Sequence, residues 1–236
     1  MSAPVVLLTG ATARIGRQTV EPLRARGFRV LAASRGGGAA GAGEPVVLDC
    51  LDPASVAATL ARHRPSHLVH LAWADGQAER WTSPANLTWV GASLDLLAAF
   101  AAAGGKRAVM VGSCAEYDWS RAADGPMAET TPLRPASLYG AAKAATSLAA
   151  LAGAGRLGLS LAWARPFFCY GVGEPEGRLA GDLVRGLAAG RTVDCTDGLQ
   201  RRDFMQTEDI GAALAALLAS DVTGPVNIGA GQAIAV

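Results

Sequence analysis

The stretch that decides the fold is Val5-Val6-Leu7-Leu8-Thr9-Gly10-Ala11-Thr12-Ala13-Arg14-Ile15-Gly16. Its apolar run is typical of a buried β-strand, and a helical pattern over residues 15–26 follows directly. Gly10 permits a tight turn, and Gly16 permits close packing of the helix. The helix N-terminus offers backbone amides and a partial positive charge to a pyrophosphate. The stretch therefore predicts a phosphate-binding loop.

One position of this loop departs from the usual glycine pattern. Ala13 stands where a middle glycine is expected, and its methyl group narrows the approach to the phosphates. An ordinary strand-to-helix turn remains the alternative interpretation. The candidate cofactor contacts of the loop are Gly10, Thr12, Ala13, Arg14, Ile15 and Gly16.

Strand-like and helix-like segments alternate along the chain. Strands are expected over 5–9, 29–33, 46–48, 67–71, 107–111 and 159–164, with helices over 15–26, 55–64, 86–103 and 138–151. This alternation predicts an α/β fold, a Rossmann-type doubly wound parallel sheet with helices on both faces. The glycine-rich residues 36–43 are expected to form a mobile surface loop outside the core.

The regularity weakens after Arg165. A turn-rich segment over 170–178, a helix over 179–189 and a helix opened by Thr207 follow. We therefore expect a NAD(P)-binding Rossmann domain over residues 1–165. Residues 166–236 are expected to form a small substrate-binding portion interleaved with the last sheet elements.

The composition of the 236 residues limits the class of protein. A formal net charge of +1 and 17% charged residues give no basic surface to recruit nucleic acid or an acidic membrane. The four cysteines lack the spacing of a zinc site, so no metal is expected. The N-terminus shows no basic leader, and no apolar run reaches ~18 residues without a charge or breaker. A cytoplasmic protein with a small-molecule partner is the expectation.

The end of the second predicted strand bears on the choice of cofactor. Ser34-Arg35 stands where an acid would bind the ribose 2′-hydroxyl of NAD. Arg35 favours a 2′-phosphate and Arg14 is a second candidate for it, so NADP(H) is favoured and NAD(H) stays open. Solvated surface roles are the alternative for both arginines. Asp49 is a candidate acceptor for the adenine amine or else a turn residue.

Three polar residues form a candidate catalytic set. Tyr139 and Lys143 are four residues apart in a predicted helix, so their side chains share one face. Ser113 follows the fifth strand, at the edge where parallel sheets carry their sites. A ketone that accepts hydride needs an acid and a donor for its oxygen. An adjacent ammonium lowers the pKa of a phenol, which suits Lys143 for tuning Tyr139. Lys143 is also a candidate cofactor contact, at the nicotinamide ribose. Taken singly, each residue also fits a structural role.

With these residues the chain resembles the extended short-chain dehydrogenase/reductase family of nucleotide-sugar epimerases, dehydratases and ketoreductases. The matching segments, in family order, are residues 9–16, 49–52, 70–72, 113–117, 139–143, 165–171, 202–204 and 226–229. The resemblance implies a Ser113, Tyr139 and Lys143 triad. It also implies that Leu71 and Ala72 line the cofactor, that Pro166 lies by the nicotinamide, and that Arg202 meets the substrate diphosphate. Cys50, beside Asp49 in the matching segment 49–52, is a further candidate cofactor contact.

Departures from the family pattern reduce the number of reactions that the chain is expected to catalyse. Family dehydratases carry an acid pair just after the catalytic hydroxyl, whereas this chain has Cys114 and Ala115, which disfavours dehydration. Phe168 replaces an asparagine that contacts the nucleotide sugar in many members, so Cys114 and Phe168 are candidate substrate contacts. Relatives continue beyond the position of Val236, which leaves either a shortened chain or an open substrate lobe.

The leading hypothesis is an NADPH-dependent ketoreductase acting on a 4-keto-6-deoxy nucleotide sugar, with Tyr139 as general acid. A nucleotide-sugar 4-epimerase is the nearest alternative. Phe167 and Phe168 also fit a reductase of an aromatic or polyketide ketone, and Ala13 fits a non-catalytic NADP-sensing module. The resemblance further implies a homodimer through helices 86–103 and 138–151, although core helices of a monomer would show the same composition.

Overall fold

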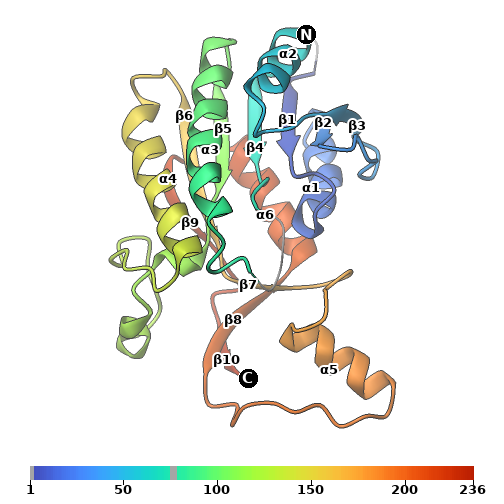
Figure 1. The fold of residues 1–236 in the computed structure, drawn as a ribbon, viewed down its shortest axis with the longest axis vertical. Coiled ribbons are helices and arrows are strands. Elements are labelled where there is room, and N and C mark those ends of the chain that lie inside the picture. Colours follow the sequence, from blue (N-terminus) through green and yellow to red (C-terminus); the bar gives the residue numbers. More distant parts are fainter. Residues whose placement is uncertain (1–2, 75–78) are drawn as a thin grey trace.

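The computed structural model describes residues 3–74 and 79–236. Its main feature is a seven-stranded parallel sheet with the strand order β3-β2-β1-β4-β5-β6-β9 (Figure 1). The strands are β1 (Val5–Thr9), β2 (Arg29–Ser34), β3 (Glu44–Val47), β4 (His67–His70), β5 (Arg107–Val111), β6 (Ser160–Pro166) and β9 (Gly224–Ile228). The order reverses between β1 and β4, which is where α/β sheets of this kind bind their ligands.

Helices cover both faces of the sheet, which confirms the predicted doubly wound fold (Figure 1). The helices α1 (Arg14–Ala25) and α6 (Thr207–Ala219) lie on one face, and α2 (Pro53–His63), α3 (Ala85–Ala102) and α4 (Leu138–Ala154) lie on the other. Successive residues of β1 contribute to the two helical layers in turn. Val6 and Leu8 pack toward α1 and α6, while Leu7 packs toward α2 and α3. Gly211 lets α6 approach the backbone of α1 at Gln18.

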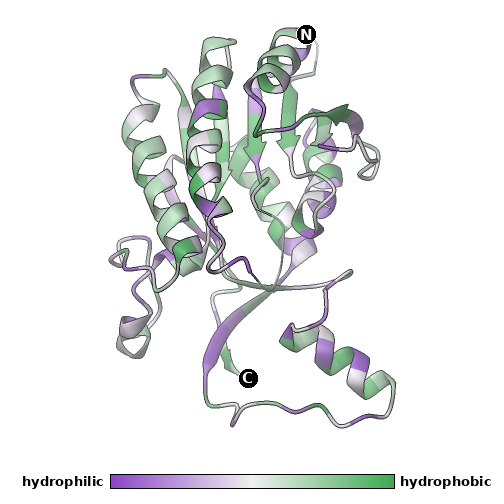
Figure 2. Ribbon diagram, in the orientation of Figure 1, coloured by the Kyte–Doolittle hydropathy of each residue, from purple (hydrophilic) through white to green (hydrophobic). Residues whose placement is uncertain are grey.

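A smaller lobe lies beyond the carboxyl edge of the main sheet (Figure 1). It contains β7 (Phe168–Tyr170), α5 (Leu179–Ala188), β8 (Arg201–Gln206) and β10 (Ala233–Ala235). The strand β8 pairs parallel with β7 and antiparallel with β10. The carboxylate of Asp203 accepts hydrogen bonds from the amides of Ala230 and Gly231, at 2.8 Å each, and so fixes the turn between β9 and β10. In Figure 2 the strands of the main sheet are hydrophobic, whereas β8 is largely hydrophilic.

The structure differs from the sequence-based expectations in several respects. The third strand covers Glu44–Val47 rather than 46–48, and β6 ends at Pro166, beyond the proposed domain boundary. The strand β9 was not among the predicted strands. The glycine-rich loop is not wholly outside the core, because Ala40 is buried and packs in the cluster beneath α1.

The helix α3 is long and apolar enough, by length and composition alone, to cross a membrane. Its apolar character has a local cause, because Trp89, Leu96, Leu97 and Phe100 are buried in the core beneath it. Two short 3₁₀ helices, η1 (Cys114–Glu116) and η2 (Trp119–Asp124), follow β5.

Candidate active site

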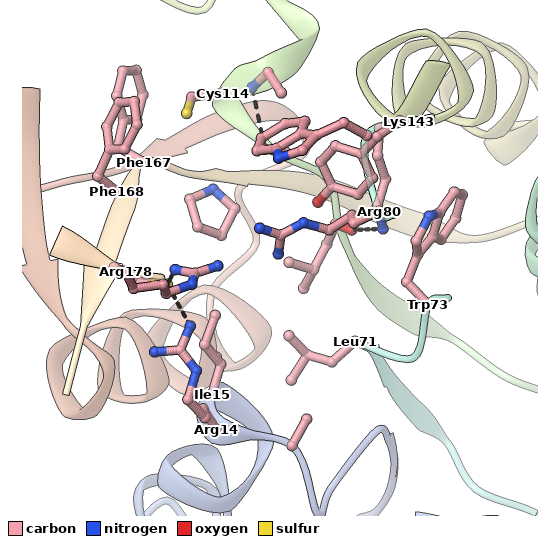
Figure 3. A pocket seen from close by; sticks show the side chains of 18 of the residues that line it. Arg14, Ile15, Leu71, Trp73, Arg80, Cys114, Lys143, Phe167, Phe168 and Arg178 are labelled. Atoms are coloured by element: carbon pink, nitrogen blue, oxygen red, sulfur yellow. Dashed lines mark hydrogen bonds between the residues drawn. The ribbon is translucent and has the colours of Figure 1, made fainter. Parts of the chain in front are cut away.

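A cavity of about 1120 Å³ opens at the carboxyl edge of the main sheet, against the small lobe (Figure 3). Most of the residues predicted for the site line it: Gly10, Thr12, Ala13, Arg14, Ile15, Ser34, Arg35, Cys50, Leu71, Ala72, Ser113, Cys114, Tyr139, Lys143, Pro166, Phe168 and Arg202. Gly16 and Asp49 are not among the lining residues. Segments far apart in the sequence therefore meet where the strand order reverses.

The phosphate loop has the geometry that its glycines predicted. Gly10 adopts φ +69°, and a Cβ there would lie 2.8 Å from the amide nitrogen of Ala72. A Cβ on Gly16 would collide with the carbonyl of Gly10. Ala13 has φ −73°, which alanine adopts freely, so the missing glycine causes no backbone strain. The helix α1 has no side-chain N-cap and no acid in its first turn. Its amides therefore suit a dinucleotide pyrophosphate.

Of the residues predicted to distinguish NADP(H) from NAD(H), only some lie together at the cavity. Ser34 and Arg35 line the cavity, and the Ser34 hydroxyl accepts a hydrogen bond from the Gly38 amide at 3.1 Å. Arg14 instead reaches toward the lobe, where its Nη1 lies 3.3 Å from Glu174 Oε1 (Figure 3). Asp49 acts as a turn residue, because its carboxylate accepts from the Leu51 amide at 2.9 Å.

Local capping places the candidate catalytic hydroxyls. The Ser137 hydroxyl accepts from the Gly140 amide at 3.1 Å and so starts α4, which puts Tyr139 in the first turn. Gly140 allows this turn to lie against the carbonyl of Ala115, beside Ser113. Burial raises the pKa of Tyr139, while the nearby Arg80 guanidinium and a hydrogen bond with the Ser113 side chain act in the opposite direction. The phenol therefore stays protonated near neutrality and can act as an acid.

Lys143 is oriented differently from the expectation. Its ammonium is buried, donates to the carbonyl oxygen of Val111 at 2.8 Å and lies 3.6 Å from the centroid of the Trp73 ring. The cation beside Tyr139 is Arg80, whose guanidinium carbon lies 5.6 Å from the centre of the phenol ring. Burial lowers the pKa of Lys143 to about 7, an effect that the Glu116 charge opposes. The Lys143 ammonium is therefore directed at the Val111 carbonyl and the Trp73 ring in this structure.

Lys143→Met is expected to change how stability depends on pH. The Lys143 pKa is about 7 in the folded chain and near 10.5 in an exposed lysine, so the unfolded chain binds more protons between these values. The free energy of unfolding of the wild-type protein should therefore rise with pH, relative to the variant, by about 1.4 kcal/mol per pH unit in this window. Denaturant titrations of both proteins at several pH values measure the difference, and parallel pH curves would contradict it.

A buried polar network lies beneath the segment that carries Ser113, on the side away from the cavity. The Glu116 carboxylate accepts from Arg165 Nε at 2.8 Å, from Trp163 Nε1 at 3.0 Å and from the Ser113 amide at 2.8 Å. Arg165 also donates to the Tyr117 hydroxyl at 3.0 Å. Gly112 leaves the room that the carboxylate needs. Glu116 is fully buried and does not line the cavity, so the wall at Cys114 and Ala115 presents no acid.

Sequence reasoning missed Glu116, Arg80 and Trp73. Ser113 and Glu116 have the Ser-x-x-Glu spacing of a capping box, which the structure contains, and that signal would have found Glu116. Arg80 and Trp73 lie in irregular segments between β4 and α3, where no periodicity predicts direction.

The substrate side of the cavity is aromatic and basic. Arg202 stacks between two rings, with its guanidinium carbon 5.4 Å from the centroid of Trp119 and 5.1 Å from that of Phe168. Phe168 in turn contacts Phe204 of β8. This wall suits a ligand that combines a flat ring or sugar face with negative charge.

Fold and site together define an NAD(P)-dependent oxidoreductase or epimerase of the Rossmann type. The chain belongs to the NAD dependent epimerase/dehydratase family, whose model matches residues 6–229. This membership confirms the resemblance seen in the sequence.

Three relatives illustrate the range of the family. The chain is 30% identical over 228 residues to a dTDP-4-dehydrorhamnose reductase of Streptomyces griseus, covering 96% of this chain and 69% of that protein. It superposes on the UDP-glucose 4-epimerase of Thermus thermophilus in complex with NAD with a TM-score of 0.81 and 25% identity, over 98% of this chain and 79% of that one. MoeE5 in complex with UDP-glucose and NAD gives a TM-score of 0.81 and 31% identity, over 99% and 78%.

Proposed function

We propose that the protein is an NADPH-dependent ketoreductase that acts on a 4-keto-6-deoxy nucleotide sugar. The observation that carries this proposal is the meeting of the Ser113 and Tyr139 hydroxyls in the cavity that also holds the phosphate loop, with Cys114 and Ala115 beside them instead of carboxylates. Similarity to a dTDP-4-dehydrorhamnose reductase supports the same substrate class.

The residues present fit a simple reduction. A bound dihydronicotinamide supplies the hydride that the carbonyl carbon accepts. Tyr139 gives its proton to the carbonyl oxygen as the C=O double bond becomes a C–OH single bond, and the phenolate regains a proton from solvent. Ser113 donates a hydrogen bond to the same oxygen. Arg202, on the aromatic wall, pairs with the substrate diphosphate.

The test is to incubate the protein with NADPH and a dTDP-4-keto-6-deoxyhexose and to follow the dihydronicotinamide absorbance together with the sugar product. One NADPH consumed per alcohol formed supports the proposal. Epimerisation of a nucleotide sugar without NADPH consumption, with NAD retained through purification, would favour the 4-epimerase alternative. Binding that shows no preference for nucleoside diphosphates would favour an aromatic ketone.

The preference for NADPH depends on Arg35. The Arg35→Ala variant should bind NADPH roughly 10–100-fold more weakly, because a charge-assisted contact to the 2′-phosphate contributes about 1.5–3 kcal/mol. Its affinity for NADH should not change. Fluorescence titrations with both cofactors measure this, with Arg62→Ala on the exposed face of α2 as the matched control. Equal loss for both cofactors would contradict the assignment.

We further propose a homodimer through α3 and α4. Leu87 and Leu148 are 61% and 62% exposed on these neighbouring helices, which leaves apolar surface for a second copy. Leu148→Glu should then convert a dimer to a monomer in sedimentation experiments, whereas Leu199→Glu in the small lobe should not. A wild-type monomer at micromolar concentration would contradict the proposal.

A further inference from the structure

Trp73 covers the buried ammonium of Lys143 at the edge of the cavity (Figure 3). The Lys143 Nζ lies 3.6 Å from the centroid of the indole ring, which is within the range of a cation–π interaction. The same ammonium donates to the Val111 carbonyl at 2.8 Å. Because Lys143 is only 3% exposed, the ring and the carbonyl replace water as neighbours of its charge.

The indole ring of Trp73 is itself held firmly. Its Nε1 donates to Asn86 Oδ1 at 2.8 Å, and Asn86 is fully buried. The Asn86 side-chain amide donates in turn to the carbonyls of Arg80 and Ser83, at 2.8 Å and 2.9 Å. The indole also stacks on Trp89, with 6.0 Å between the ring centroids and 28° between the ring planes. These contacts fix the orientation of the ring, so that its face and not its edge meets the ammonium.

The charged and titratable groups around Lys143 do not by themselves keep it charged. Burial favours the neutral amine and lowers the pKa of Lys143, while the Glu116 carboxylate on η1 opposes this effect. His70 on β4 is neutral, because burial and the Lys143 charge lower its pKa to about 3. Tyr139, one turn earlier in α4, is a protonated phenol near neutrality. Burial thus outweighs the surrounding charges, and direct contacts with the ammonium decide how much of it stays charged.

We propose that Trp73 is a positioning residue: the face of its indole ring holds the Lys143 ammonium charged and in place at the carboxyl end of β5. Tryptophan binds a cation best among the aromatic side chains, and the attraction is larger when both groups are out of water. With the ammonium held in this way, Lys143 can act on Tyr139 and on the ribose of a bound cofactor. Only this last step rests on the proposed function, because the charge on Lys143 can be measured in the protein alone.

The test follows the titration of Lys143 directly, because the chain contains only two lysines, Lys106 and Lys143. Protein labelled with ¹³C at the lysine ε-carbon gives two NMR signals, and the exposed Lys106 is the internal reference. Trp73→Leu should lower the pKa of Lys143 by about one unit, equivalent to roughly tenfold weaker proton binding, because the cation loses its ring. Trp119→Leu, which removes a cavity-lining ring that contacts Arg202 instead, should leave the Lys143 titration unchanged.

The direction of the shift separates the proposed role from simple packing. If the Trp73 ring only excluded water, the smaller leucine would admit water to the ammonium, and the pKa of Lys143 would rise. A pKa that rises or does not change in Trp73→Leu overturns the proposal.

Fluorinated tryptophans at position 73 keep the test decisive if Trp73→Leu does not fold. They preserve the indole shape and the Nε1–H donor but withdraw electron density from the ring face. The pKa of Lys143 should therefore fall stepwise as the number of fluorine atoms increases, because the attraction depends on the negative charge of that face. A pKa that does not respond to the fluorine atoms overturns the proposal.

The kinetic readout uses NADPH and a ketone substrate. The alkaline limb of the kcat profile should move to lower pH in Trp73→Leu, because less of Lys143 is charged at each pH. An unmoved limb beside a shifted Lys143 titration would overturn the positioning role in the reaction. Absence of any ketone reduction by the wild-type protein tells against the proposed function, whereas the lysine titration still decides whether Trp73 holds the charge.

Discussion

Tyr139→Phe is expected to lower kcat for ketone reduction by about 10²–10⁴-fold, because the variant lacks the proton that the reduced oxygen must receive. The phenyl ring keeps the contact with Trp81 and the face beneath Arg80, so fold and cofactor affinity should persist. Steady-state rates of NADPH oxidation, together with a cofactor titration of the same sample, separate the two effects.

The matched control for this variant is Tyr170→Phe. Tyr170 is 39% exposed on β7 and does not line the cavity, so its loss should leave kcat within about twofold of the wild-type value. Retained activity in Tyr139→Phe, or loss of activity that follows loss of cofactor binding, would remove Tyr139 from the chemistry.

Glu116→Ala is expected to produce the largest loss of stability. The substitution leaves the Arg165 guanidinium buried without its counter-ion and removes acceptors from Trp163 and Ser113. Breaking a buried pair in this way costs about 3–5 kcal/mol. Denaturant unfolding of the variant measures the loss, and Glu208→Gln on the exposed first turn of α6 is the control.

A double variant, Glu116→Leu with Arg165→Met, shows whether the unpaired charge or the lost packing destabilises Glu116→Ala. Removing both charges avoids the unpaired guanidinium, so the double variant should be more stable than Glu116→Ala alone. A double variant as unstable as the single one would mean that packing, rather than the unpaired charge, accounts for the loss. A loss below about 1 kcal/mol in Glu116→Ala would show that the network contributes little.

The sequence predicts the parts of this site that depend on local rules. Gly10 and Gly16 follow from the tight turn and close packing between a strand and a helix. The spacing of Tyr139 and Lys143 follows from helix periodicity. The strand β9 escaped prediction because Gly224 and Pro225 resemble a turn, and only its pairing with β6 makes it a strand.

The direction of long side chains depends on contacts that are distant in sequence. Arg14 looked available for a 2′-phosphate, but its partner Glu174 lies 160 residues further along the chain. Lys143 shares a helix face with Tyr139, yet its ammonium reaches the carbonyl of Val111 and the ring of Trp73. No local pattern encodes these choices, because each is a competition among partners that only the folded chain brings together.

The most direct test of the central claim is the fate of the hydride. The protein is given NADPH that carries deuterium at the transferable position together with a dTDP-4-keto-6-deoxyhexose, and the sugar product is analysed by mass spectrometry. The proposed function predicts one deuterium on the carbon of the new alcohol for each NADP⁺ released, and almost none with Tyr139→Phe. An epimerised sugar without deuterium, formed with no loss of NADPH, would contradict it.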